Sequence, residues 1–199
     1  DFTADLGFVP RTDRLKWGSG INYIIYDNSK VFNTHSPGFL GITYWRPSLD
    51  YKKTDHMYRF GWETFFRNQA RVEARFSNNY IYLLDPFDPT RTPGAAPLPE
   101  DTGYYFNQFT LTYESNATNV FTYNAETTLG RFFNGDITAV RGEVGIRIQP
   151  KAQFSLGFDY NNITLPGPYA EADIFFTTFR AEISFSKKLF WSTLAQYSD

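Results

Sequence analysis

The feature that most constrains the fold is an alternation of apolar and polar residues with a period of two, repeated along most of the chain. In residues 140–148 the even positions except Gly142 are aliphatic, while the odd positions hold charged residues or glycine. The same alternation recurs in residues 58–67, 70–77, 108–114, 121–129, 154–160 and 175–186. Successive side chains of an extended strand point to opposite faces, so this pattern predicts β-strands with one apolar and one polar face.

The length and number of these segments favour a large antiparallel sheet. With the looser alternation in residues 2–9, 17–26 and 39–46, the chain has about eleven strand candidates. Several run for about 9–12 residues, whereas an ordinary strand has about 5–6 and a tilted strand that crosses a bilayer needs about 9–11. No segment shows a helical period of 3.6.

The expected connections differ in length. Links near 68–69, 115–119, 149–152 and 186–188 are short, and 161–171 is longer. The link at 84–104 contains five prolines and two glycines, while Asn134-Gly135 is a hairpin signal. Short turns alternating with longer loops are typical of outer-membrane barrels. The sequence leaves open whether the segment 84–104 folds inward and plugs the lumen.

Composition excludes several classes of protein. No run approaches the roughly 18 apolar residues of a membrane-spanning helix. The chain has no cysteine, which excludes a disulfide framework and a thiol nucleophile. The net charge is -2 with both signs well mixed, so there is no basic footprint for nucleic acid. Aromatic residues make up 20% of the chain, and a lipid-facing band would accommodate that much ring surface.

No catalytic or metal-binding motif is found. The two histidines, His35 and His56, are expected in or beside loops, without acidic or histidine partners at ligand spacing. Two acidic pairs, Glu63 with Glu73 and Glu126 with Glu143, resemble the paired carboxylates of glycosidases. Arginines flank both pairs, so charge neutralisation is the better explanation. We therefore expect neither an enzyme nor a cofactor or metal site.

These observations predict one all-β domain over residues 1–199: an antiparallel transmembrane β-barrel, or a fragment of a larger one. Single-chain bacterial barrels have even strand numbers, so an odd count of eleven indicates strands missing from this chain or supplied by another protein. The expected location is the bacterial outer membrane, with lipid and possible envelope proteins as partners. We expect a channel, transport or structural role, with a polar face lining a lumen. The predicted pore-lining residues are Glu126, Arg141, Glu143, Arg147, Arg180 and Glu182.

Two other functions remain open. A soluble carbohydrate-binding β-sandwich also has one apolar and one polar face, and its aromatic rings would stack on sugars. A scaffolding subunit of a larger membrane complex would need no permeant. Solubility without detergent and binding of polysaccharide would favour the sandwich.

Several short motifs resemble those of a C-terminal domain of unknown function found in large bacterial envelope proteins. The matching segments are 7–13, 130–135, 165–167, 185–186 and 194–197, which together span nearly the whole chain. The resemblance implies an outer-membrane β-barrel in a longer parent chain. It also implies an upstream carbohydrate-binding module of the family-9 type, and it provides no catalytic residues.

Overall fold

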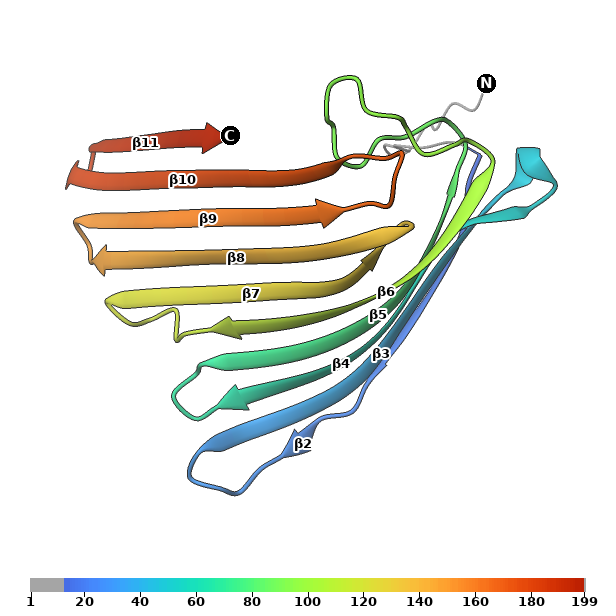
Figure 1. Ribbon diagram of the computed structural model, residues 1–199. Coiled ribbons are helices and arrows are strands. Elements are labelled where there is room, and N and C mark those ends of the chain that lie inside the picture. Colours follow the sequence, from blue (N-terminus) through green and yellow to red (C-terminus); the bar gives the residue numbers. More distant parts are fainter. Residues whose placement is uncertain (1–12, 199) are drawn as a thin grey trace, which may run out of the picture.

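The computed structural model describes residues 13–198, which form one antiparallel sheet of eleven strands (Figure 1). The elements are β1 (Leu15–Asn22), β2 (Ile25–Tyr26), β3 (Phe32–Arg46), the 3-10 helix η1 (Pro47–Leu49), β4 (Lys52–Phe66), β5 (Arg71–Leu83), β6 (Thr102–Glu114), β7 (Phe121–Phe132), β8 (Gly135–Ile148), β9 (Ala152–Thr164), β10 (Glu171–Ser186) and β11 (Leu189–Ser198). The prediction of an all-β antiparallel sheet is confirmed. The strand candidate at 2–9 lies outside the described residues.

Each strand from β3 onward pairs with the strands that precede and follow it in the sequence. β1 and β2 both pair with β3, so the eleven strands occupy ten positions across the sheet. The odd strand count therefore gives no argument of its own for missing strands, and strands supplied from outside this chain stay a prediction. β1 and β11 form the two edges, run in opposite directions and are not paired with each other. The sheet is curved but not closed (Figure 1), so closure into a barrel stays a prediction.

Pro37 explains why the first edge is divided into β1 and β2. The register pairs Asn22 with Gly38 and Ile25 with His35, which places Tyr23 opposite Pro37. The Tyr23 amide donates to the Pro37 carbonyl at 3.0 Å. Proline has no N–H, so the reciprocal bond cannot form and the ladder is interrupted there.

The two faces of the sheet differ in chemistry. Phe60 lies opposite Phe76, and Phe76 lies opposite Phe109; we call the side that carries them the apolar face. On the other side Glu73 lies opposite both Glu63 and Thr112, and we call this the charged face. Directly opposite residues of an antiparallel pair share a face, so these pairs assign every other position along the strands.

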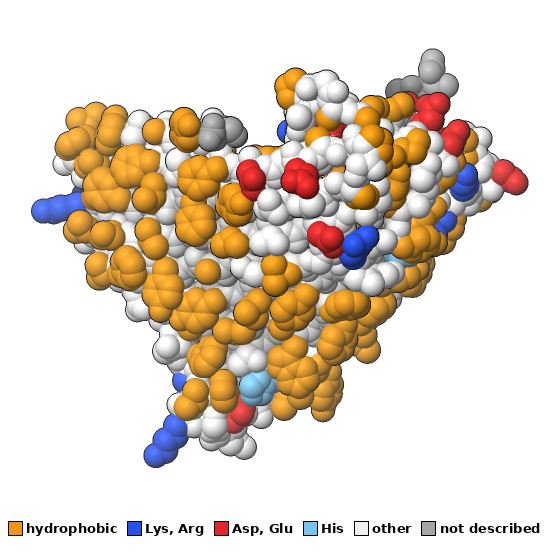
Figure 2. All heavy atoms as spheres, viewed as in Figure 1, with side chains coloured by type: hydrophobic (Ala, Val, Ile, Leu, Met, Phe, Trp, Pro, Cys, Tyr) orange, Lys and Arg blue, Asp and Glu red, His pale blue; other side chains and the backbone are white. Residues whose placement is uncertain are grey.

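The apolar face is exposed. Figure 2 shows hydrophobic side chains in a broad band across the sheet, with the few charged ones lying toward the strand ends. The exposed fraction is 54% for Phe60, 49% for Phe76 and 52% for Leu156. No second layer covers this face among residues 13–198. An apolar surface of this extent marks a contact with lipid or with another protein.

The longest connection, residues 84–101, packs against the charged face. Its Leu98 is fully buried and contacts a cluster that includes Leu83 and Phe133. Leu83 stands an even number of residues from Glu73 in β5 and so lies on the charged face. Phe87 and Leu98 bond to each other through their backbones, at 3.1 and 2.8 Å, which makes the segment a small hairpin of its own. This connection therefore folds inward over one end of the sheet.

The remaining connections largely follow the expected pattern. Connections 67–70, 115–120, 149–151 and 187–188 lie at one end of the sheet and are short. The connection 84–101 lies at the other end, with 47–51, 133–134 and 165–170. The predicted link at 161–171 was too long, because β9 continues to Thr164. Asn161 and Asn162 pair with β10 there, so asparagines that resemble turn residues are held in the ladder.

No helix in the described part of the chain is long and apolar enough to cross a membrane.

Candidate functional site on the charged face

The structure places all six predicted pore-lining residues on the charged face. Arg141 lies opposite Glu126, and Glu143 stands two residues further along β8 on the same side. Arg147 lies opposite Gln153, which in turn lies opposite Glu182. Arg180 stands two residues before Glu182 in β10 and shares its face. Their role in lining a pore stays a prediction.

Only two of these six residues belong to the ion-pair network of this face. Arg141 Nη2 lies 2.7 Å from Asp159 Oδ2, and Arg141 Nη1 lies 4.0 Å from Glu126 Oε1. Glu126 Oε2 accepts from Arg75 Nη2 at 2.8 Å and from the Thr112 hydroxyl at 3.0 Å. Arg75 therefore connects Glu126 and Arg141 with a second group of charged side chains, which lies on β4, β5 and β6.

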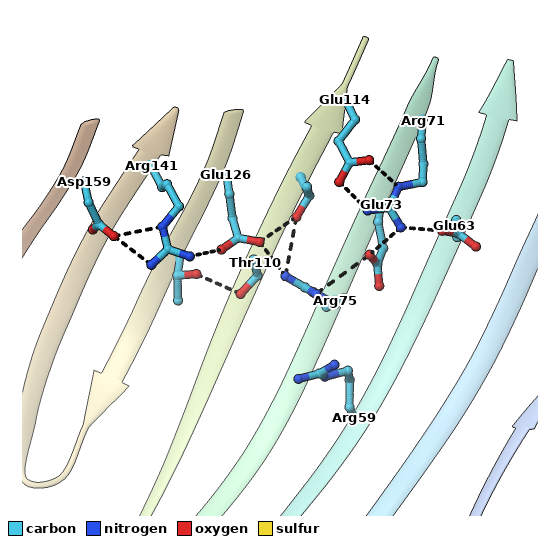
Figure 3. A network of polar contacts seen from close by, with 12 residues as sticks. Arg59, Glu63, Arg71, Glu73, Arg75, Thr110, Glu114, Glu126, Arg141 and Asp159 are labelled. Atoms are coloured by element: carbon cyan, nitrogen blue, oxygen red, sulfur yellow. Dashed lines mark hydrogen bonds and ion pairs between the residues drawn. The ribbon is translucent and has the colours of Figure 1, made fainter. Parts of the chain in front are cut away.

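Arg71 is the centre of that second group (Figure 3). Its Nη1 lies 2.7 Å from Glu63 Oε1, and its Nη2 lies 2.5 Å from Glu114 Oε1. Glu73 Oε2 lies 3.6 Å from Arg71 Nη1 and 3.8 Å from Arg75 Nη1, which joins the two groups. The network thus runs without interruption from β4 to β9, perpendicular to the strands.

Of the two acidic pairs identified in the sequence, the structure brings only one into direct opposition. Glu63 and Glu73 do lie opposite each other, but both contact Arg71, as the neutralisation argument expects. Glu126 and Glu143 are not opposite partners, because Glu126 faces Arg141 and Glu143 faces Asn124. The carboxylates of this face therefore serve mainly as partners for arginines.

The network organises the face more than it stabilises the fold. Its side chains are partly exposed, and pairs of this kind contribute only about 0–1 kcal/mol each. What it provides is a row of fixed charges of alternating sign, each with a defined partner. Such a row is compatible with water and polar solutes and incompatible with lipid.

Two of the hollows on the charged face are lined by its charged side chains at mid-strand. One has a volume of about 340 Å³ and is lined by residues of β1, β3, β4 and β5, including Arg59, Glu63 and Glu73. The other, of about 420 Å³, lies over β7 to β11 and includes Glu143 and Arg180. Side chains of four or five neighbouring strands line each hollow, which agrees with the charged face being the concave, inner side of the curved sheet.

Both histidines lie in strands, and the expectation that they lie in or beside loops was wrong. His35 of β3 lies within hydrogen-bond distance of Thr64 Oγ1, at 2.9 Å, and of Asp27 Oδ2, at 3.2 Å. His56 of β4 is buried and bonds to Asn78 Oδ1 at 2.8 Å. No cluster of three or more metal-ligating side chains occurs within residues 13–198.

The alternation in the sequence identified the charged side chains, and the hollows could not be found in the same way. Gly20, Gly38 and Gly61 belong to three different strands, and nothing in their local sequence brings them together. Only the register reveals that they adjoin one cavity on the same face.

A scan against protein-family models and searches of curated proteins and of solved structures returned no match.

Proposed function

We propose that this chain forms part of the wall of a bacterial outer-membrane β-barrel, with its apolar face toward lipid and its charged face toward a water-filled lumen. Its role would be that of a channel, a transport component or a structural component of the envelope, without catalysis. The observation that carries the proposal is the pairing of an exposed apolar face with a continuous network of ion pairs on the opposite, concave face.

Strand length supports the proposal. The strands from β3 to β10 have between 12 and 16 residues. A tilted strand crosses a bilayer with about 9–11 residues, so each of these strands is long enough with residues to spare at both ends. Ordinary sheets of soluble proteins use strands of about 5–6 residues.

The alternative of a soluble carbohydrate-binding sandwich requires a second sheet over the apolar face. Residues 13–198 provide no such sheet. A scaffolding subunit of a membrane complex remains compatible with every contact described, because it differs from a channel only in lacking a permeant.

Membership in the family of C-terminal envelope domains is part of the proposal. One of the matching segments, 130–135, forms the tight β7–β8 hairpin. Gly130 has a φ of +144°, and a Cβ there would lie 2.4 Å from the Asn107 carbonyl oxygen. A Cβ on Gly135 would lie 2.1 Å from the Thr164 carbonyl oxygen. Both glycines of the motif thus have a structural requirement independent of any family.

The first test is expression of the intact parent protein in a bacterium, followed by membrane fractionation and gel migration with and without boiling. Recovery in the outer membrane with heat-modifiable migration is expected for a closed barrel. Recovery in the soluble fraction, together with binding to polysaccharide, would refute the membrane assignment.

A matched pair of variants tests the orientation of the sheet. Leu111→Arg places a charge on the apolar face of β6, whereas Thr110→Arg places it on the charged face one residue away. An arginine toward lipid costs about 2–4 kcal/mol near the bilayer midplane. We expect Leu111→Arg to lower the yield of heat-modifiable protein and Thr110→Arg to leave it near the wild-type level. Equal loss in both variants would contradict the assignment of the faces.

A further inference from the structure

The floor of the 340 Å³ hollow over β1, β3, β4 and β5 is made of glycine. Gly20, Gly38 and Gly61 lie on three neighbouring strands, and Gly38 and Gly61 are direct register partners. A Cβ added to Gly38 would collide with Asn22 Oδ1, whereas one added to Gly61 would meet no atom closer than 3.8 Å. The space above Gly61 is therefore open and forms part of the hollow, whereas the Asn22 side chain covers Gly38.

Arg59 is the one mid-strand cation of β4 and β5 that the ion-pair network does not include. Arg71 and Arg75 each contact carboxylates, whereas no carboxylate within residues 13–198 lies within ion-pair distance of Arg59. The contact found for its guanidinium is Met57 Sδ, at 3.5 Å from Nη2. Figure 3 shows Arg59 apart from the dashed network, on a strand that borders the hollow.

The other polar groups around the hollow limit the charge that a ligand can carry. Glu63 and Glu73 border the hollow and already share Arg71. The Arg59 guanidinium has no carboxylate partner, and two carboxylates lie nearby. The hollow therefore favours a ligand with a single negative charge over a dianion such as phosphate. A guanidinium fork matches the two oxygens of a carboxylate. Asn22 and Ser36 also line the hollow and provide hydrogen-bonding groups suited to hydroxyls.

The size of the hollow sets the size of the ligand. At about 340 Å³ it lies at the lower end of the roughly 300–1,000 Å³ typical of small-molecule sites. A single sugar ring fills that space better than an oligomer does.

We propose that this hollow is a binding site for a small hydroxylated carboxylate of sugar-acid size, with Arg59 as the residue that binds its carboxylate. The site rests on the proposed function in one respect, because the charged face must be open to water. In a transport barrel this hollow would bind anionic sugars at the inner wall, along the path that they take through the lumen.

The test uses the intact protein in detergent and measures binding by calorimetry, with D-glucuronate as the probe. Glucose serves as the neutral comparison, and inorganic phosphate serves as the dianionic one when all measurements are made at about pH 8, where phosphate is mainly a dianion. We expect glucuronate to bind at least tenfold more tightly than either. Equal affinity for glucose would overturn the role of the carboxylate, equal affinity for phosphate would overturn the ligand class, and absence of glucuronate binding would overturn the site.

Two variants of the site and one control complete the experiment. Arg59→Gln is expected to weaken glucuronate binding at least tenfold. Gly61→Leu is expected to abolish binding by filling the hollow, since the position has room for a Cβ. Arg131→Gln, at an exposed strand end on the opposite face, should bind as the wild type does. Unchanged binding in Arg59→Gln would refute the proposal.

Heat-modifiable migration of the same preparations separates the two proposals. Protein that migrates as a closed barrel and fails to bind glucuronate contradicts the site alone. Protein that is soluble without detergent and shows no heat-modifiable migration contradicts the membrane assignment, whatever it binds.

Discussion

Replacement of Leu98 by alanine should release the connection 84–101 from the charged face while leaving the sheet intact. Leu98 is fully buried, and its neighbours include Leu83 at the end of β5 and Phe133 in the β7–β8 hairpin. The connection contacts the sheet through Leu98 and through the ring of Phe87, whose centroid lies 5.6 Å from that of Phe133, whereas the strands are held by their own ladders. The loss should therefore be local.

The expected magnitude follows from the burial. Truncation of a fully buried leucine to alanine costs about 2–5 kcal/mol, which combines lost transfer energy with an unfilled cavity. A loss of about 3 kcal/mol raises the ratio of open to docked connection about 100-fold. The Asp88 turn and the Phe87–Leu98 bridge lie within the connection, so neither replaces the lost contact with the sheet.

Trypsin provides the assay, because Arg91 is the only lysine or arginine in residues 84–101. When opening and closing are fast, cleavage follows the population of the open form. We expect cleavage after Arg91 to accelerate strongly in Leu98→Ala, while heat-modifiable migration stays unchanged. Leu49→Ala is the matched control, since Leu49 lies in the connection 47–51 at the same end of the sheet and is 39% exposed. Cleavage of Leu98→Ala at the wild-type rate would refute the reasoning.

Three further changes have defined outcomes. Arg71→Gln should lower the temperature at which heat-modifiable migration is lost, because three carboxylates within 4 Å of Arg71 would lose their shared cation; an unchanged midpoint would show that the network contributes nothing. Burial of Asp88 raises the pKa of its carboxyl, but hydrogen bonds from Thr90, Thr92 and Arg91 together outweigh this and hold the pKa below its usual range. Its stabilisation of the connection is therefore present above the normal carboxyl pKa and lost as pH falls through the lowered value; the Thr90 amide NMR signal should follow that loss, and Asp88→Asn should remove the pH dependence. Pro37→Thr should restore a donor opposite the Tyr23 carbonyl and slow hydrogen exchange along the first edge, whereas faster exchange would show that the proline is required there for another reason.

The sequence was sufficient for most of the fold because the alternation of side chains is local information. It identified the strands from β4 onward and the polar side chains of the charged face. Asn161 and Asn162 were misassigned to a loop because turn propensity is local too, and the pairing of β9 with β10 overrode it. Similarly, the loop signals around His35 and His56 gave no indication that both are held in long strands.

The candidate site depended on information that is not local. The six predicted pore-lining residues all lie on the charged face, yet Arg71, where the network is densest, was not among them. Its contacts join residues 8 and 43 positions apart in the sequence, so they follow from register. The same holds for Leu98, whose burial against β5 cannot be read from a proline-rich segment.

Because β1 and β2 share one edge of the sheet, the number of strands that can be added to close it into a ring is restricted to even values. Because ten positions alternate in direction, β1 and β11, the edges of the sheet formed by residues 13–198, already run antiparallel to each other. Direct pairing of β1 with β11 would close the ring with no added strand, and any inserted set of antiparallel strands must be even in number. A second copy of the sheet satisfies the rule, since it adds ten positions, whereas a lone extra strand would force one parallel contact. An odd number of strands in a density map of a closed assembly would therefore reveal at least one parallel contact.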